Sequence, residues 1–158
     1  MTVDFKPQHR TPDRMLLEYV TDTFMLGLLV WREARSETYA GKLAVAWSVL
    51  NRVERPSWWG RTLLEVITKK WQYSSLTDPN DKQLTRWPNP TDSTWWECLQ
   101  VAHDVLNNLV GNPVKHADSY YAVSMDRAGN PPKWATPETF VAQVGDHKFY
   151  NLDRDVEV

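Results

Sequence analysis

The feature that most constrains the fold of this sequence is a pair of apolar helical patterns within its first third. The first pattern ends at Glu33 and holds apolar residues at helical spacing, Phe24, Met25, Leu28 and Leu29. The second, over residues 40–53, is an apolar stripe wide enough for a well-buried helix, and Pro56 ends it. We therefore expect two consecutive core helices, with Glu33 at the carboxyl end of the first.

The chain length predicts a single domain, since 158 residues are enough to bury a core without metal or disulfide. We expect residues 1–20 to form a polar tail and a short helix that begins at Pro12. Residues 21–158 then form the folded domain, in which Thr21 or Asp22 caps the helix leading to Glu33.

Turn and capping residues predict the remaining elements. Thr94 and Glu97 form a predicted capping box for a helix over residues 95–110. We also expect short helices at 63–67 and from Pro137 onward, a strand or loop at 71–75, extended segments at 120–123 and 147–150, and turn-rich loops at 78–90 and 126–132.

Charge and hydropathy exclude several classes of protein. The 18 Lys and Arg nearly balance the 20 Asp and Glu without a block of one sign, so nucleic acid is not an expected partner. The mean hydropathy is -0.55, and the longest apolar run, 24–31, is far shorter than the roughly 20 residues of a membrane span. The first residues lack a signal-peptide pattern, so we expect synthesis in the cytoplasm. We also expect a monomer.

Metal and nucleophile chemistry find no support in the sequence. Cys98 is the single cysteine, which excludes an internal disulfide, and the four His residues have no partner at zinc-ligand spacing. No Ser stands on a glycine-framed elbow. We expect neither a metal nor another cofactor.

Tryptophan is unusually frequent, with nine residues in the chain. Aromatic side chains usually fill cores, but exposed rings also stack on the apolar faces of sugars. Five of the tryptophans lie in loop-like sequence and are candidates to line a groove: Trp58, Trp59, Trp71, Trp87 and Trp134.

Glu33 is the principal candidate for chemistry. A carboxylic acid that stays protonated near neutral pH can donate a proton to a glycosidic oxygen, and burial against apolar neighbours raises a carboxyl pKa. The exit of an apolar helix is a suitable place for such a group. The alternative is a solvated helix-end residue that pairs with Arg32 or Arg35.

The segment from Trp31 to Val53 resembles the opening motif of the cell wall hydrolase family that includes the spore-cortex-lytic enzyme SleB. Its matching features are Glu33-Ala34-Arg35, Glu37, Gly41 and Leu50-Asn51-Arg52-Val53. The resemblance continues through Gln72-Tyr73-Ser74, Tyr120-Tyr121 and the terminal Gly145, His147, Phe149 and Tyr150. The chain departs from the family where Arg32 and Ser36 replace glycines that flank the Glu-Ala-Arg triplet.

The resemblance implies a lysozyme-like α+β fold, mainly helical, with a small β and loop subdomain. It also implies cleavage of the bond between N-acetylmuramic acid and N-acetylglucosamine in peptidoglycan, commonly as a lytic transglycosylase. In that reaction one glutamate, here Glu33, acts as acid and then as base while the sugar's own 6-hydroxyl forms a 1,6-anhydro end.

Further residues are expected to bind the glycan. They are Gln72, Tyr73, Ser74, Tyr120, Tyr121, Trp134, His147 and Tyr150. Strand alternation should direct one tyrosine of the 120–121 pair into the groove, without indicating which. His147 stands between Asp146 and Lys148, and a structural role is its alternative.

Two alternative functions remain open. A hydrolysing muramidase on the same fold needs a second carboxylate, for which Glu37, Asp78 and Asp81 are candidates with structural alternatives of their own. A non-catalytic glycan-binding or virion protein is the other. The expected biological setting is a phage endolysin that acts in the periplasm or cell wall of its host, and a bacterial wall-remodelling enzyme is the alternative.

Overall fold

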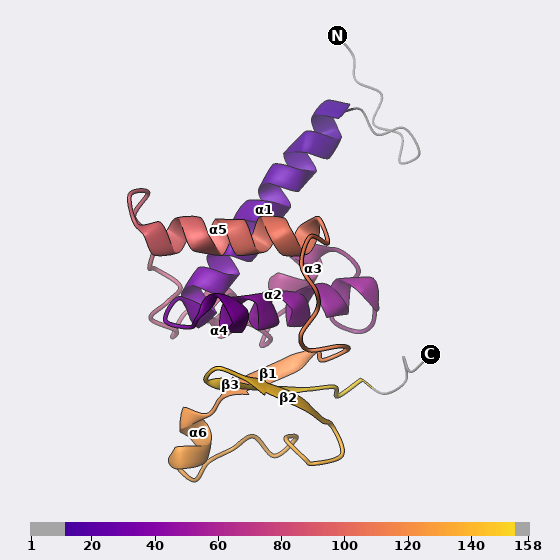
Figure 1. The fold of residues 1–158 in the computed structure, drawn as a ribbon, viewed down its shortest axis with the longest axis vertical. Helices are drawn as coiled ribbons and strands as arrows, with labels where there is room; N and C mark the ends of the chain where they lie inside the picture. Colours follow the sequence, from indigo (N-terminus) through magenta and orange to yellow (C-terminus); the bar gives the residue numbers. More distant parts are fainter. Residues whose placement is uncertain (1–11, 154–158) are drawn as a thin grey trace.

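Helices α1 (Pro12–Ala34), α2 (Tyr39–Glu54) and α5 (Ser93–Leu106) form the helical body of the computed structural model, which describes residues 12–153. Helix α5 lies across α1, and α2 packs against both (Figure 1). The fully buried side chains include Leu26, Leu29, Val30, Val45, Val49, Val101 and Val105. These side chains come from all three helices, so the core lies among them. Burial of each contributes about 1.5–3 kcal/mol to stability.

Helix α1 is continuous, so the predicted break near residue 20 is wrong. The expected caps, Thr21 and Asp22, lie inside the helix, and Thr23 donates its hydroxyl back to the carbonyl of Tyr19 at 2.7 Å. The first turns of α1 project beyond the helical body (Figure 1), while residues 1–11 of the predicted tail lie outside the described residues. Neither α1 nor any other described helix is long and apolar enough to cross a membrane.

The predicted boundaries of α2 and of the short helix α3 (Leu63–Ile67) are confirmed. Thr38 caps α2 by accepting a backbone N–H, and the helix ends shortly before Pro56. Helix α3 begins with a capping box in which Thr62 and Glu65 each bond the other's backbone. Both helices are therefore delimited by local side chains that the sequence shows directly.

Helix α5 begins and ends earlier than predicted. Its cap is Asp92, whose carboxylate accepts the backbone N–H of Thr94 at 2.9 Å, while Glu97 takes part in an ion pair. Asn108 has a φ of 53°, a left-handed conformation that Asn tolerates better than most residues and that ends the helix. The predicted capping box and the extension to Val110 are wrong.

The segment 71–75, predicted as a strand or loop, forms a turn that leads into the short helix α4 (Ser74–Thr77). Trp71 has a φ of 70°, a left-handed conformation that is incompatible with an extended strand. The strand alternative is therefore wrong. The turn brings three consecutive predicted site residues, Gln72 to Ser74, toward the carboxyl end of α1.

A three-stranded antiparallel sheet lies against one side of the helical body (Figure 1). Its strand order is β1 (Ser119–Ala122), β3 (His147–Tyr150) and β2 (Phe140–Val144). Phe149, opposite Tyr120 in the register, is fully buried and joins the helical core. The small sheet on a mainly helical body confirms the expected α+β class and the two predicted extended segments.

Strand β2 occupies the region predicted as a short helix from Pro137, and that prediction is wrong. Gly145, with a φ of 57°, forms the tight turn that pairs β2 with β3. Gly145-Asp146 between two apolar segments was the hairpin signal in the sequence. The short helix α6 (Ser124–Arg127) enters the loop predicted over residues 126–132.

Candidate active site

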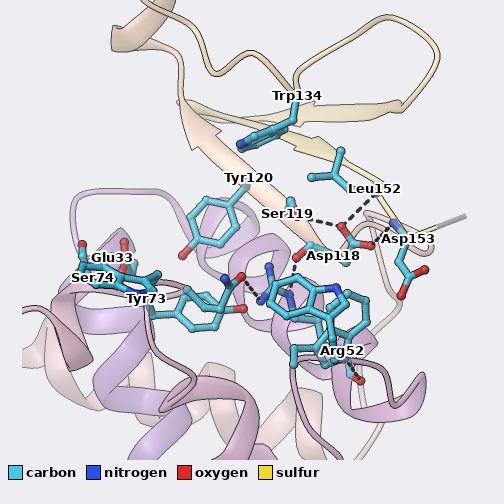
Figure 2. A pocket seen from close by; sticks show the side chains of 14 residues that line it. Glu33, Arg52, Tyr73, Ser74, Asp118, Ser119, Tyr120, Trp134, Leu152 and Asp153 are labelled. Carbon is cyan, nitrogen blue, oxygen red and sulfur yellow. Dashed lines mark hydrogen bonds between the residues drawn. The ribbon is translucent and has the colours of Figure 1, made fainter.

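A groove of about 700 Å³ lies between the helical body and the sheet (Figure 2). Its volume is in the range of ligand-binding pockets. Its walls come from α1, α2, the turn before α4, strand β1 and two loops. The tertiary structure brings together in it six of the predicted site residues: Glu33, Gln72, Tyr73, Ser74, Tyr120 and Trp134.

Glu33 lies half-buried in the last turn of α1, at one end of the groove (Figure 2). Its Oε1 accepts a 2.7 Å hydrogen bond from the hydroxyl of Ser75, which is itself buried. Burial raises the pKa of the Glu33 carboxyl, the Ser75 hydrogen bond lowers it, and the negative charge of Asp81 raises it further. The net shift is upward, so Glu33 stays protonated to higher pH than an exposed glutamate and can serve as a proton donor.

The two arginines beside Glu33 point elsewhere, so the alternative of a helix-end ion pair is wrong. Arg35 donates to the side-chain oxygen of Gln83 at 2.8 Å. Arg32 is buried and donates hydrogen bonds of 3.0–3.1 Å to three carbonyl oxygens, those of Ser75, Leu84 and Arg86. An arginine at this position therefore fastens the 78–90 loop to the end of α1.

Two tyrosine hydroxyls contribute neutral donors. Tyr120 directs its hydroxyl toward the Glu33 end of the groove (Figure 2), and burial together with the Glu33 charge raises its pKa well above the usual value. Tyr73 is buried, and its hydroxyl has no hydrogen-bond partner among the described residues. Burial raises the pKa of Tyr73 to about 12, against the lowering effect of Arg52. Both hydroxyls stay protonated at physiological pH.

Arg52, in α2, organises the middle of the groove. Its buried guanidinium donates to the Asp118 carbonyl oxygen at 2.6 Å and to Oε1 of Gln72 at 3.0 Å. It also lies over the rings of Trp59 and Tyr73, 5.3 and 5.2 Å from their centroids. Because Arg52 holds the amide oxygen of Gln72, the amide nitrogen is the group that Gln72 presents to a ligand.

Tryptophans surround the groove, as their loop positions predicted. Trp58, Trp71 and Trp134 line it with 59%, 74% and 37% of their surface exposed, whereas Trp59 is buried in its wall. Trp87 does not line the groove and lies under the Arg32 guanidinium instead, 4.8 Å from it. The three exposed rings give the groove the stacking surfaces that a sugar chain requires.

Three predicted substrate-binding residues do not line the groove. Tyr121 follows Tyr120 in β1 and therefore points to the opposite face of the sheet, where Tyr150 stacks on it at 5.7 Å. His147 is buried and meets the Tyr120 ring edge-on at 5.3 Å. The groove tyrosine of the pair is thus Tyr120, and His147 packs against its ring.

Glu37, a candidate second carboxylate, belongs to the α1–α2 turn and is buried against the β2–β3 turn. Its Oε1 lies 2.9 Å from Nδ1 of His147 and accepts the backbone N–H of Asp146 at 3.1 Å. A Cβ at Gly145 would lie 2.5 Å from Oε2 of Glu37, and the φ of 57° at this position also favours glycine. Glu37 joins the sheet to the helical body and does not line the groove.

The candidate carboxylates Asp78 and Asp81 are engaged within their own turns, although the charge of Asp81 acts on Glu33 and raises the pKa of the Glu33 carboxyl. Asp78 and Asp81 each accept a backbone N–H two residues ahead at 2.8 Å, the usual role of Asp in a turn. The groove carboxylates besides Glu33, within the described part of the chain, are Asp118 and Asp153, which lie at its far end (Figure 2). Asp118 is buried and accepts the backbone N–H groups of Leu152 and Asp153.

Sequence reasoning missed three residues of the site. Arg52 belongs to the Leu-Asn-Arg-Val motif, which marked its position but gave no role for its side chain. Ser75 directly follows the Gln-Tyr-Ser triplet and is directed to Glu33 by the α4 turn. Asp118 precedes the tyrosine strand and had no signal of its own, because its partners, Leu152 and Asp153, are distant in sequence.

Comparison with known families gives a match over most of the chain. A family model described as Cell Wall Hydrolase matches residues 36–150. The match begins after Glu33. The groove and the neighbouring sequence therefore identify Glu33 as the candidate proton donor, and the family match does not. No curated protein matches this chain.

Two solved structures share the fold. One is the catalytic domain of the germination-specific lytic transglycosylase SleB from Bacillus anthracis, with 26% identity and a TM-score of 0.63 over 82% of this chain and 93% of that one. The other is the catalytic domain of the Bacillus cereus SleB protein, with 24% identity and a TM-score of 0.64 over 83% of this chain and 90% of that one.

Proposed function

Because this chain belongs to the cell wall hydrolase family and acts on peptidoglycan, we propose that it cleaves the glycan strands as a lytic transglycosylase, with Glu33 as acid and then as base. The scissile bond is the one between N-acetylmuramic acid and N-acetylglucosamine. The place of action is the cell wall, where this substrate lies.

The observation that carries the proposal is the place of Glu33 at its end of the groove. The pKa of its carboxyl is raised by burial, and the other carboxylates that line the described groove, Asp118 and Asp153, lie at its far end. Asp81, whose charge also acts on Glu33, does not line the groove and is engaged by the Ser74 hydroxyl and the backbone N–H of Gln83. A single protonated carboxyl suits a reaction in which one group gives and then takes a proton.

In the first step, protonated Glu33 donates its proton to the glycosidic oxygen as the bond to the muramic carbon breaks. The positive charge that develops on the sugar ring is stabilised by the newly formed Glu33 carboxylate. The neutral hydroxyl of Tyr120 and the amide of Gln72 can donate hydrogen bonds to the acetamido and hydroxyl oxygens of the sugar. These donors fix the ring against the carboxyl group.

In the second step, the 6-hydroxyl oxygen of the same sugar attacks its own anomeric carbon. The Glu33 carboxylate accepts the hydroxyl proton, which restores the enzyme and leaves a 1,6-anhydro end. No water molecule enters the reaction, so no second carboxylate is needed to activate one.

A hydrolysing muramidase would need such a group. Retaining enzymes place the two carboxyl groups about 5–5.5 Å apart, and inverting enzymes about 6.5–9.5 Å. Glu37 is held by the β2–β3 turn, Asp78 is engaged in its own turn, and Asp81 accepts the hydroxyl of Ser74 and the backbone N–H of Gln83. These contacts favour transglycosylation over hydrolysis.

The experiment is digestion of purified peptidoglycan by the wild-type protein and by Glu33→Gln, followed by mass spectrometry of the soluble fragments. Fragments with anhydro ends, one water lighter than hydrolysed ends, are expected from the wild type and none from the variant. Reducing ends would overturn transglycosylation in favour of the muramidase. Peptidoglycan binding without any release, unaffected by Glu33→Gln, would instead identify a non-catalytic glycan-binding protein.

A further inference from the structure

A second aromatic pocket lies on the face of the sheet that points away from the groove. Its volume is about 560 Å³, and the side chains that matter for its chemistry are Tyr121, Asp126, Phe140, Gln143, Lys148 and Tyr150. Residues 131–137 contribute its opposite wall. We call it the outer pocket, and it is separated from the groove by strand β1, whose consecutive residues Tyr120 and Tyr121 face the two cavities.

The base of the outer pocket is a supported aromatic cluster. Tyr150 stacks on Tyr121, with ring centroids 5.7 Å apart and an interplanar angle of 24°. Phe140 meets the Tyr150 ring edge-on at 5.5 Å and leaves 46% of its own surface exposed. The exposed ring is therefore held in place by its neighbours and offers a preformed apolar surface.

The polar side of the outer pocket carries no net charge. Asp126 accepts hydrogen bonds from Lys148 at 2.6 Å and from the Tyr121 hydroxyl at 2.9 Å. The charges of Asp126 and Lys148 cancel, so the pocket does not select an anionic or cationic ligand. It offers fixed polar groups beside an aromatic ring, which suits a neutral, hydroxyl-rich ligand.

N-acetylated sugars have this chemistry, because each ring combines an apolar face with hydroxyl and acetamido groups. The peptide stems of peptidoglycan carry free carboxylates instead. Lys148 is already paired with Asp126 and has little to offer a carboxylate. The match in charge thus favours the glycan over the peptide.

Trp134 connects the outer pocket with the groove. It lines the groove, and its ring meets those of Tyr121 and Tyr150 edge-on at 5.8 and 5.5 Å. The two cavities therefore share one wall. Trp134 therefore offers a polymer bound in the groove an aromatic surface that leads toward the outer pocket.

We propose that the outer pocket is a second glycan-binding site, which holds N-acetylated sugars of the peptidoglycan while the groove cleaves a strand. The proposal rests on the proposed function, since it assumes a polymeric glycan substrate. Two linked sites raise the effective concentration of the polymer at the groove without new contacts at the scissile bond. The outer pocket should therefore matter for insoluble peptidoglycan and not for short soluble glycans.

The first test is a nuclear magnetic resonance titration of the Glu33→Gln protein with an N-acetylglucosamine trimer. We expect the amide signals of Tyr121, Phe140 and Lys148 to shift in a saturable way, in addition to those of the groove. Shifts confined to the groove would overturn the proposal. Shifts of the outer-pocket signals with a free stem peptide, and not with the trimer, would overturn it as well.

The second test measures co-sedimentation with insoluble peptidoglycan in the same Glu33→Gln background. Phe140→Ala is expected to raise the apparent Kd about two- to tenfold, the change that the loss of one aromatic contact produces. Phe140→Tyr keeps the ring and should bind normally. Leu109→Ala, which removes another exposed apolar side chain (63% exposed), is the matched control and should have no effect.

The third comparison separates the two proposals. In an otherwise wild-type protein, Phe140→Ala should slow fragment release from insoluble peptidoglycan and leave cleavage of a short soluble glycan unchanged. Equal effects on both substrates, with a lowered Tm, would assign Phe140 a structural role and overturn the outer-pocket proposal. Failure of the wild type to release any fragment contradicts the proposed function instead, and the sedimentation result still reports on the outer pocket.

Discussion

Ser75 donates a 2.7 Å hydrogen bond from its hydroxyl to Oε1 of Glu33, across 42 residues of sequence. The bond joins α4 to the end of α1 and fixes the orientation of the carboxyl group that we propose as the acid. It also stabilises the charged form of Glu33 and so opposes the increase in pKa caused by burial. Ser75 thus orients the Glu33 carboxyl group and limits the increase in its pKa.

Ser75→Ala is expected to raise the pKa of Glu33 further, because the hydrogen bond that lowers it is lost. The alkaline limb of the pH–rate profile should move to higher pH, since Glu33 then keeps its proton longer. The rate constant kcat should fall roughly tenfold, because the carboxyl group is less well oriented. Rates of fragment release measured over a series of pH values check both effects.

Ser48→Ala is the matched control for the loss of a buried hydroxyl. Ser48 is fully buried in α2 and donates its hydroxyl to the carbonyl of Val45 at 2.7 Å. Its replacement should leave the pH–rate profile in place. A profile for Ser75→Ala that does not differ from that of Ser48→Ala would show that the Ser75 hydrogen bond has no catalytic consequence.

Glu33→Gln is expected to raise the Tm at neutral pH. The pKa of Glu33 is raised in the folded chain, so the stability that this group contributes is present below its unfolded value of about 4.3 and is lost as the pH rises through the folded value. Gln is uncharged throughout and avoids that loss. Thermal unfolding followed by circular dichroism should show a higher Tm for Glu33→Gln than for the wild type at about pH 7, and equal Tm values near pH 4. A Tm difference that does not change with pH would contradict this explanation.

Glu37→Ala is expected to reduce the free energy of unfolding by about 1–3 kcal/mol, the usual effect of leaving buried polar groups without a partner. The groups affected are the backbone N–H of Asp146 and the ring of His147. Glu37→Gln keeps an oxygen that can accept from Asp146 and should retain most of the activity. Urea unfolding and fragment release measure the two effects; loss of activity in a stable Glu37→Gln protein would restore Glu37 as a second carboxylate.

Trp71→Gly is expected to weaken glycan binding without destabilising the protein. The φ of 70° at Trp71 is unfavourable for a side chain by about 1–2 kcal/mol and is natural for glycine. Removing the exposed ring should raise KM about two- to tenfold, while the Tm stays equal or rises. Trp87→Ala is the control, since Trp87 is 64% exposed but does not line the groove; an equal increase in KM for both variants would contradict a specific role of Trp71.

Local sequence signals predicted the helical body well. The stripe over residues 40–53 and the Thr62 capping box act within a single helix, so neighbouring residues suffice to define them. Predictions failed where two local signals competed. Thr21 and Asp22 are good caps, yet α1 continues through them, and Asp92 caps α5 in place of Thr94.

The candidate site was only partly visible in the sequence. Gln72, Tyr73 and Ser74 were expected at the groove and line it, whereas Tyr121, Tyr150 and His147 were expected there and do not. Strand alternation separates Tyr120 from Tyr121, but the direction of the alternation depends on which face of the sheet meets the helices. That face is determined by the burial of Phe149 in the core.

The sequence by itself determined the core helices, the absence of internal disulfide bonds and the position of Glu33 at the end of an apolar helix, because each depends on composition or on neighbouring residues. Only the tertiary structure decided the acidity of Glu33. Its burial depends on packing, and the Ser75 hydrogen bond and the charge of Asp81 act through space from residues more than 40 positions away along the chain.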